Sequence, residues 1–115
     1  MLDFDGTQVE VNHQKFNELS ITWNTVNPAV PVRWPTGDQF RLAWRNDAVP
    51  ELSALHGRQL QIVDILEWTG SDLAHGTIAV SFVFAEGQVT ISNGLDENYL
   101  AFNQPLAAYR SHPLT

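Results

Sequence analysis

The sequence contains no cysteine, only one lysine and no long apolar run. Without cysteine, the chain can form neither disulfides nor thiolate metal sites. This absence favours an intracellular, bacterial setting. No stretch approaches the roughly 20 apolar residues of a membrane-spanning helix, and the first residues lack the basic and apolar regions of a signal peptide. We therefore expect a cytoplasmic protein that does not enter membranes.

Positive charge is also scarce. The chain has 6 Lys and Arg residues against 13 Asp and Glu residues, a formal net charge of −7. A field of this sign repels phosphate backbones, so we expect no nucleic-acid binding. The acidic residues are spread along the whole chain and not gathered in a tail. They either keep the surface solvated or match a basic protein partner.

Tryptophan, by contrast, recurs in a regular pattern. Each of the four tryptophans stands two residues after an aliphatic side chain, in Ile21–Trp23, Val32–Trp34, Leu42–Trp44 and Leu66–Trp68. This spacing puts both side chains on one face of a β-strand. We expect most of these faces to fill a core. A tryptophan left on a concave face would instead form a stacking platform for a ligand, and Trp34, next to Pro35, is the candidate for exposure.

Alternating apolar residues predict strands over residues 8–11, 16–23, 39–45, 59–68, 77–85 and 88–92, with apolar material at 99–102 for one more short element. Three prolines between residues 25 and 35 favour an edge strand or an extended loop. The strand over 59–68 changes phase, which predicts either burial on both faces or a bulge near Val63 and Asp64.

Two local features stand out. Residues 77–92 read as a hairpin that turns at Glu86 and Gly87. Residues 47–57 read as the one helix, capped by Asp47, with Pro50 in its first turn and Gly57 at its end.

The elements together predict an all-β or β-rich α+β fold. We expect a single domain over residues 1–115, with about six mostly antiparallel strands and one short helix. The strands would form a sandwich, a roll or a partly open barrel. Residues 104–115 are expected to be a loosely attached tail, held by Leu106 and Tyr109 if at all.

The segment Leu2–Thr7 resembles the first motif of the haloacid dehalogenase-like phosphatases, D-x-D-G-T. The resemblance would make Asp3 the nucleophile and Asp5 the acid/base. Those enzymes place the motif after a buried parallel strand in an α/β fold, together with a distant lysine and a later acidic pair. Only Met1 and Leu2 precede the motif here, and no strand–helix–strand pattern follows it. We interpret the segment as a polar turn.

The densest polar cluster lies at residues 93–98. The stretch Val89–Asn98 is similar to a strand-plus-loop segment of small bacterial proteins of unknown activity. The polar cluster either forms a turn in which Asp96 or Asn98 caps a short helical turn, or binds a protein partner through Asn93, Asp96, Glu97 and Asn98. The alternating acidic spacing of a calcium loop is missing, so we expect no metal there.

A second candidate site is basic. Arg41 and Arg45 share the face of the predicted strand 39–45 that is opposite its aromatic side chains, and Arg33 lies across a predicted turn. These arginines either pair with neighbouring carboxylates such as Glu67 or Asp38, or form with Trp34 a site for a sugar or an anion. The four histidines lie on separate elements and show no metal or catalytic spacing. We expect no catalytic residues and no cofactor.

These observations favour a non-enzymatic bacterial protein-binding domain, by analogy an immunity or antitoxin protein that inhibits a basic partner. The alternative is a β-domain that binds or hydrolyses a small ligand with exposed Trp and Arg side chains. Exposed tryptophan in a concave pocket would favour the alternative.

Overall fold

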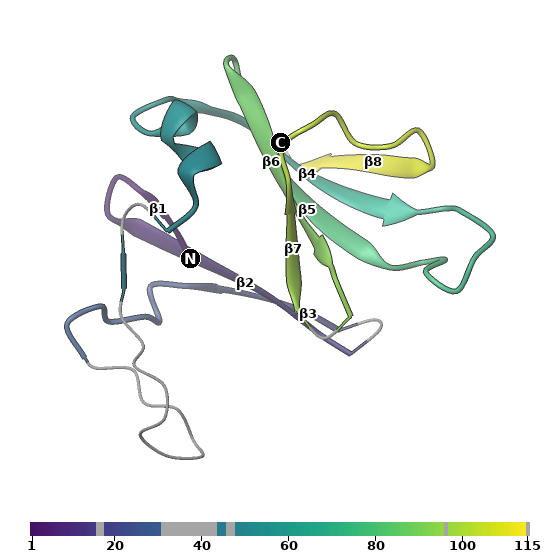
Figure 1. Ribbon diagram of the computed structural model, residues 1–115, viewed down its shortest axis with the longest axis horizontal. Helices are drawn as coiled ribbons and strands as arrows, with labels where there is room; N and C mark the ends of the chain where they lie inside the picture. The colour runs from purple at the N-terminus through teal and green to yellow at the C-terminus, as the bar shows by residue number, and fades with distance from the viewer. Residues whose placement is uncertain (16–17, 31–43, 46–47, 96, 115) are drawn as a thin grey trace.

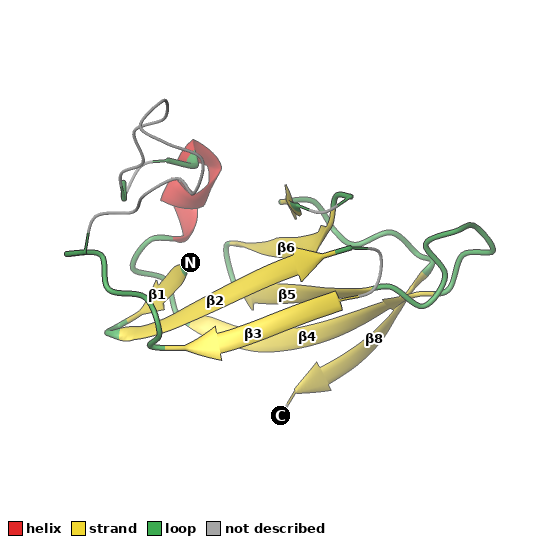
Figure 2. Cartoon of the chain, turned by 90° about the horizontal axis from the view of Figure 1, so that it is seen from below, coloured by secondary structure: helices red, strands yellow, loops and turns green. Residues whose placement is uncertain are grey.

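The computed structural model describes residues 1–15, 18–30, 44–45, 48–95 and 97–114. These residues form eight strands and one short helix, arranged as two antiparallel sheets packed face to face (Figures 1 and 2). Within the described residues, neither sheet closes into a barrel. The prediction of a strand-rich, mostly antiparallel fold with one short helix is confirmed.

The smaller sheet has the order β1-β2-β3 and consists of β1 (Leu2–Phe4), β2 (Thr7–Gln14) and β3 (Glu18–Trp23). Strand β1 was not predicted. It pairs with β2 through a turn at Asp5 and Gly6, whose φ values are 55° and 91°. Positive φ at both residues defines the turn that Asp-Gly favours in hairpins. The Gly6 amide also donates to Asp3 Oδ1 at 2.8 Å. The phosphatase-like segment therefore forms a hairpin.

The larger sheet has the order β7-β6-β5-β4-β8. Its strands are β4 (Leu60–Trp68), β5 (Ile78–Phe84), β6 (Gly87–Asn93), β7 (Asn98–Ala101) and β8 (Tyr109–Leu114). The predicted β5–β6 hairpin is confirmed, with Phe82 opposite Val89. Because Phe84 pairs with Gly87, the turn lies one residue earlier than predicted, at Ala85 and Glu86.

The prediction of a loosely attached tail is wrong for Tyr109–Leu114. These residues pair with β4 from Trp68↔Tyr109 to Val63↔Leu114. The segment lacks the apolar alternation of a strand because it lies at a sheet edge, where Pro113 and polar side chains are tolerated. Strands β7 and β8 lie at opposite edges of the sheet, so residues 102–108 connect one edge to the other.

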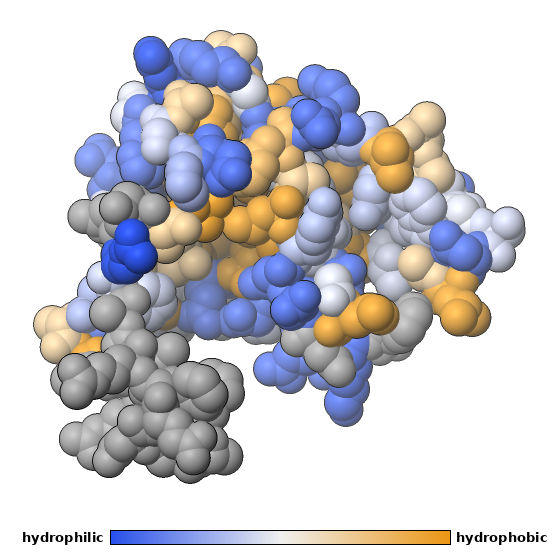
Figure 3. Space-filling view, viewed as in Figure 1, coloured by the Kyte–Doolittle hydropathy of each residue, from blue (hydrophilic) through white to orange (hydrophobic). Residues whose placement is uncertain are grey.

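The core lies between the two sheets, where β2 packs against β6 and β7. Its buried members are Val9, Val11, Val80, Phe82, Phe84, Val89 and Ile91. The ring centroids of Phe4 and Phe82 are 5.6 Å apart, which links the N-terminal hairpin to the larger sheet. In the space-filling view, hydrophobic side chains gather in the middle of the molecule and hydrophilic ones surround them (Figure 3).

The predicted phase change in β4 is resolved by a bulge. The register shifts between Leu60 and Ile62, near the start of the strand and not at Val63 and Asp64 as predicted. Val63 and Ile65 consequently face the core, while Leu66 is buried on the opposite face of the sheet. Strand β4 therefore has both a bulge and buried side chains on its two faces, two features that the sequence suggested as alternatives.

The helix is shorter than predicted. It is a 3₁₀ helix, η1 (Pro50–Leu55), with Val49 at its N-cap position and no side-chain cap. Pro50 stands in the first turn as expected, and Leu52 and Leu55 pack against the core. Asp47, the predicted cap, lies outside the described residues. No helix in the described part of the chain is long and apolar enough to span a membrane.

The three tryptophans that the structure describes do not fill the core as predicted. Trp23 ends the edge strand β3 and is 60% exposed. Trp44 is also exposed and lies in no regular element, while Trp34 lies outside the described residues. The predicted strand over 39–45 lies outside them too, apart from Trp44 and Arg45. Of the three tryptophans that the structure describes, only Trp68 is partly enclosed, and it lines a pocket.

Candidate functional site

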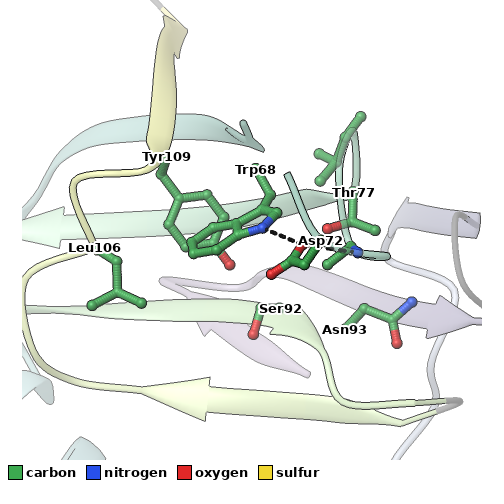
Figure 4. Close-up of a pocket in the computed structure, with 9 residues that line it drawn as sticks. Trp68, Asp72, Thr77, Ser92, Asn93, Leu106 and Tyr109 are labelled. Atoms are coloured by element: carbon green, nitrogen blue, oxygen red, sulfur yellow. Dashed lines mark hydrogen bonds between the residues drawn. The ribbon is translucent and has the colours of Figure 1, made fainter. Parts of the chain in front are cut away.

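A pocket of about 220 Å³ lies at one end of the larger sheet. The end of β4, the loop over residues 69–77, the end of β6 and the chain leading into β8 enclose it (Figure 4). Its lining comprises Trp68, Asp72, Ala74, Thr77, Ile78, Ser92, Asn93, Leu106 and Tyr109. These residues are far apart in the sequence, and the order of the strands brings them together.

The indole of Trp68 is fixed in place. The backbone amide of Trp68 donates to Thr77 O at 2.9 Å, and the backbone carbonyl of Trp68 accepts from the Gly76 amide at 2.8 Å. The indole Nε1–H donates to Asp72 Oδ1 at 2.8 Å. A Cβ atom on Gly70 would lie 2.5 Å from the indole nitrogen, so only glycine allows the backbone to approach this closely.

Tyr109 faces Trp68 across the β4–β8 pair. Their ring centroids are 5.0 Å apart, and the ring planes meet at 72°. The Thr69 amide and the Thr69 hydroxyl both donate to Ala108 O, at 2.9 and 2.5 Å, and so anchor the chain next to the tyrosine. Burial raises the pKa of the Tyr109 phenol above 10.0, and a hydrogen bond with Ser92 partly opposes this shift.

The raised pKa of Tyr109 gives a direct test of the pocket. In a Tyr99→Phe variant, which keeps only this tyrosine, the midpoint of the phenolate absorbance change should lie above pH 10.0. The unfolded phenol ionises near its ordinary value, so stability should be lost as the pH rises from that value through the folded one. Ionisation at or below the ordinary value would show that the ring is not buried in the folded protein.

Exposed apolar side chains line the pocket or lie next to its lining residues in the chain or in the sheet. Leu106 lines it and is 66% exposed, while Leu73, between two lining residues, is 89% exposed. Leu95 follows Asn93 by two residues and is 75% exposed. Tyr99, also exposed, pairs with the lining residue Ser92. We call Leu73, Leu95, Tyr99 and Leu106 the pocket rim.

The predicted partner-binding residues that the structure describes have different surroundings and do not form one binding surface. Asn93 lines the pocket, donates through Nδ2 to Lys15 O and accepts from the Leu95 amide at 2.9 Å. The Asn98 carboxamide instead bonds to β2 in the other sheet. Glu97 is exposed, and its carbonyl accepts from the Gly94 amide at 2.8 Å. Asp96 lies outside the described residues.

Of the residues predicted for a small-ligand site, Arg33, Trp34 and Arg41 lie outside the described residues. Arg45 is exposed and does not line the pocket. The aromatic site that the structure does contain uses Trp68 and Tyr109. The sequence pattern marked Trp68, whereas Tyr109 was assigned to the tail, so nothing in the sequence paired the two.

The charge around the pocket is mainly negative. The lining contains the carboxylate of Asp72 and no lysine, arginine or histidine. The exposed carboxylate of Glu97 lies four residues after Asn93, and Asn93 bonds to Lys15, whose ammonium is 3.5 Å from the exposed carboxylate of Glu18 at the start of β3. Among the described residues, no group of three or more potential ligands is arranged to hold a metal ion.

We compared the chain with protein-family models, with curated proteins and with solved structures, and found no match in any of the three.

Proposed function

We propose that this chain is a non-enzymatic, cytoplasmic protein-binding domain that holds a basic protein partner at the pocket rim. Its biological role would be that of a bacterial immunity or antitoxin-like inhibitor. The observation that carries the proposal is the rim itself: four large exposed apolar side chains line one aromatic pocket or adjoin its lining residues.

The rim has the anatomy of a protein interface. Single exposed leucines are ordinary on a protein surface, but apolar groups gathered around a pocket with a polar margin are typical of interaction sites. Leu73 and Leu95 stand on loop tips with most of their surface in water. A partner that covered these side chains would remove their apolar surface from water, which would stabilise the complex.

The charge of the chain supports a basic partner. The net charge is −7, and Asp72 and Glu97 place carboxylates in and beside the pocket lining. Such a field attracts a basic protein and orients it before contact, which raises the association rate more than it lengthens the lifetime of the complex. An inhibitor that must reach its target before the target acts gains from fast association.

The second candidate function is the binding of a small ligand such as a sugar. The pocket favours it, because aromatic rings beside hydroxyl, carboxamide and carboxylate groups suit sugar recognition. Its volume of about 220 Å³ is smaller than that of most pockets for drug-sized ligands. A monosaccharide is the largest sugar that we would expect to enter.

The protein-binding proposal can be tested by partner capture with two matched variants. The rim variant combines Leu73→Ser, Leu95→Asn and Leu106→Ser; asparagine suits position 95 because φ there is 65°. The control variant combines Val30→Ser and Leu114→Ser, two exposed apolar positions outside the rim. The immobilised chain and its control should capture the same basic protein from cells of the source organism. The rim variant should bind it at least about tenfold more weakly.

The captured protein should also show the effect of charge. Its association rate with the chain should fall as salt rises, because exposed charges are screened beyond about 8–10 Å at ordinary ionic strength. Replacing Glu18 and Glu97 with glutamine should slow association and leave dissociation nearly unchanged. Equal capture by the rim variant, or a partner without basic character, would contradict the proposal.

A further inference from the structure

We infer that the pocket between Trp68 and Tyr109 receives one cationic side chain, an arginine or a lysine, from a protein partner. This inference rests on the proposed function for the source of the side chain. Three independent features of the pocket lead to it: the angle between the two rings, a carboxylate without a cationic neighbour, and the small volume.

The two rings form a corner that suits a cation. Their planes meet at 72° with centroids 5.0 Å apart, so a group seated in the corner lies near both rings and over the face of at least one. Ring faces attract cations within about 6 Å of the centroid, and tryptophan does so most strongly. Gly70 and the bond to Asp72 hold the indole in this orientation before any ligand arrives.

Asp72 supplies a negative charge at the nitrogen edge of the same indole. Its Oδ1 atom accepts from Trp68 Nε1 at 2.8 Å and from the Ala74 amide at 3.0 Å. Within the described residues, Oδ2 accepts no hydrogen bond and no cationic side chain neighbours it in the lining. Asp72 is exposed, and its carboxylate, held in place by two donors with one oxygen accepting no bond from the described residues, can pair with a guanidinium or an ammonium group at a modest gain in affinity.

The volume favours a single side chain. Pockets for drug-sized ligands usually measure about 300–1,000 Å³, and this one measures about 220 Å³. The carboxylate disfavours anionic ligands by repulsion. The exposed rim around the entrance provides apolar surface for the part of a partner that carries the cationic side chain.

The test uses simple probes and follows the indole N–H resonance of Trp68 by NMR, assigned through its loss in Trp68→Phe. N-propylguanidinium should shift this resonance saturably, and so should n-butylammonium. The neutral isostere N-propylurea should not. The inferred ligand is a side chain carried by a peptide backbone. The tripeptide Ac-Gly-Arg-Gly-NH₂ should therefore bind about as tightly as propylguanidinium.

Three variants localise the effect. Asp72→Asn keeps the oxygen that accepts from the indole and the Ala74 amide but loses the charge, so affinity for propylguanidinium should fall about two- to fivefold. Tyr109→Leu removes one wall and should weaken binding by about two- to fivefold. Glu51→Gln removes an exposed charge outside the pocket lining and should leave the affinity unchanged.

The outcomes separate this inference from the proposed function. Equal binding of propylurea and propylguanidinium, or no saturable shift with either cation, would overturn the inference while leaving partner capture at the rim untouched. Binding of propylguanidinium but not of the arginine tripeptide would overturn the assignment to a protein side chain. A saturable shift with glucose, and none with the cations, would establish the small-ligand alternative instead.

Discussion

Replacing Phe82 with alanine should lower the free energy of unfolding by about 3–5 kcal/mol, as truncation of core aromatic residues does. Phe82 is 3% exposed and lies on β5, the central strand of the larger sheet. Its ring contacts Phe4 from the other sheet, so the truncation would leave a cavity that both sheets border. Chemical denaturation monitored by circular dichroism measures the loss.

Two further variants test the assignment of Phe82. Leu73→Ala removes an apolar side chain that is 89% exposed and should change stability by less than about 0.5 kcal/mol. A double-mutant cycle between Phe4→Ala and Phe82→Ala should give a coupling of about 0.5–1.5 kcal/mol beyond the separate losses. A loss below about 1 kcal/mol for Phe82→Ala would mean that this face of β5 does not form the core.

The strands with clean alternation could be predicted from the sequence. Val9 and Val11 stand two residues apart, as do Phe82 and Phe84. A strand with one buried face places an apolar residue at every second position, so the sequence shows this alternation. The edge strands could not be predicted in the same way. Strand β8 is held by backbone pairing with β4 and not by burial of its side chains. Its sequence therefore shows no alternation of apolar residues.

The pocket was beyond sequence reasoning for a similar reason. Trp68 and Tyr109 are 41 positions apart in the numbering of the chain and meet only because β8 returns to pair with β4. The polar loop between β4 and β5 contributes Asp72, whose role depends on a bond to the indole. Local composition contains neither the strand order nor the path of the chain from β7 to β8.

The second large effect should come from Asn98, a residue that the sequence placed in a partner-binding loop. Its Oδ1 atom accepts from the His13 amide at 3.0 Å and lies 2.9 Å from His13 Nδ1. Its Nδ2 atom donates to Val11 O at 2.6 Å. The other ring nitrogen of His13 lies 2.9 Å from Ile78 O. One carboxamide therefore joins β7 to β2, and the imidazole extends this link to β5.

The burial of His13 sets the size of the effect. His13 is only 5% exposed, whereas Asn98 is itself exposed, so water can replace part of what the Asn98 carboxamide provides. Truncation would leave the His13 amide and the Val11 carbonyl without those partners, and each unsatisfied buried group costs about 1–3 kcal/mol. Because the Asn98 position is open to water, Asn98→Ala should lower the free energy of unfolding by about 1–3 kcal/mol.

Asn12→Ala is the matched control, because that carboxamide bonds only to Glu10 on the same strand. It should cost less than about 1 kcal/mol. If Asn98 instead served only to contact a partner, Asn98→Ala would cost as little as the control and would weaken partner capture. A large stability loss would explain the polar cluster at residues 93–98 differently: Asn98 would hold the two sheets together beneath the pocket rim, and partner contact would belong to the exposed side chains around it.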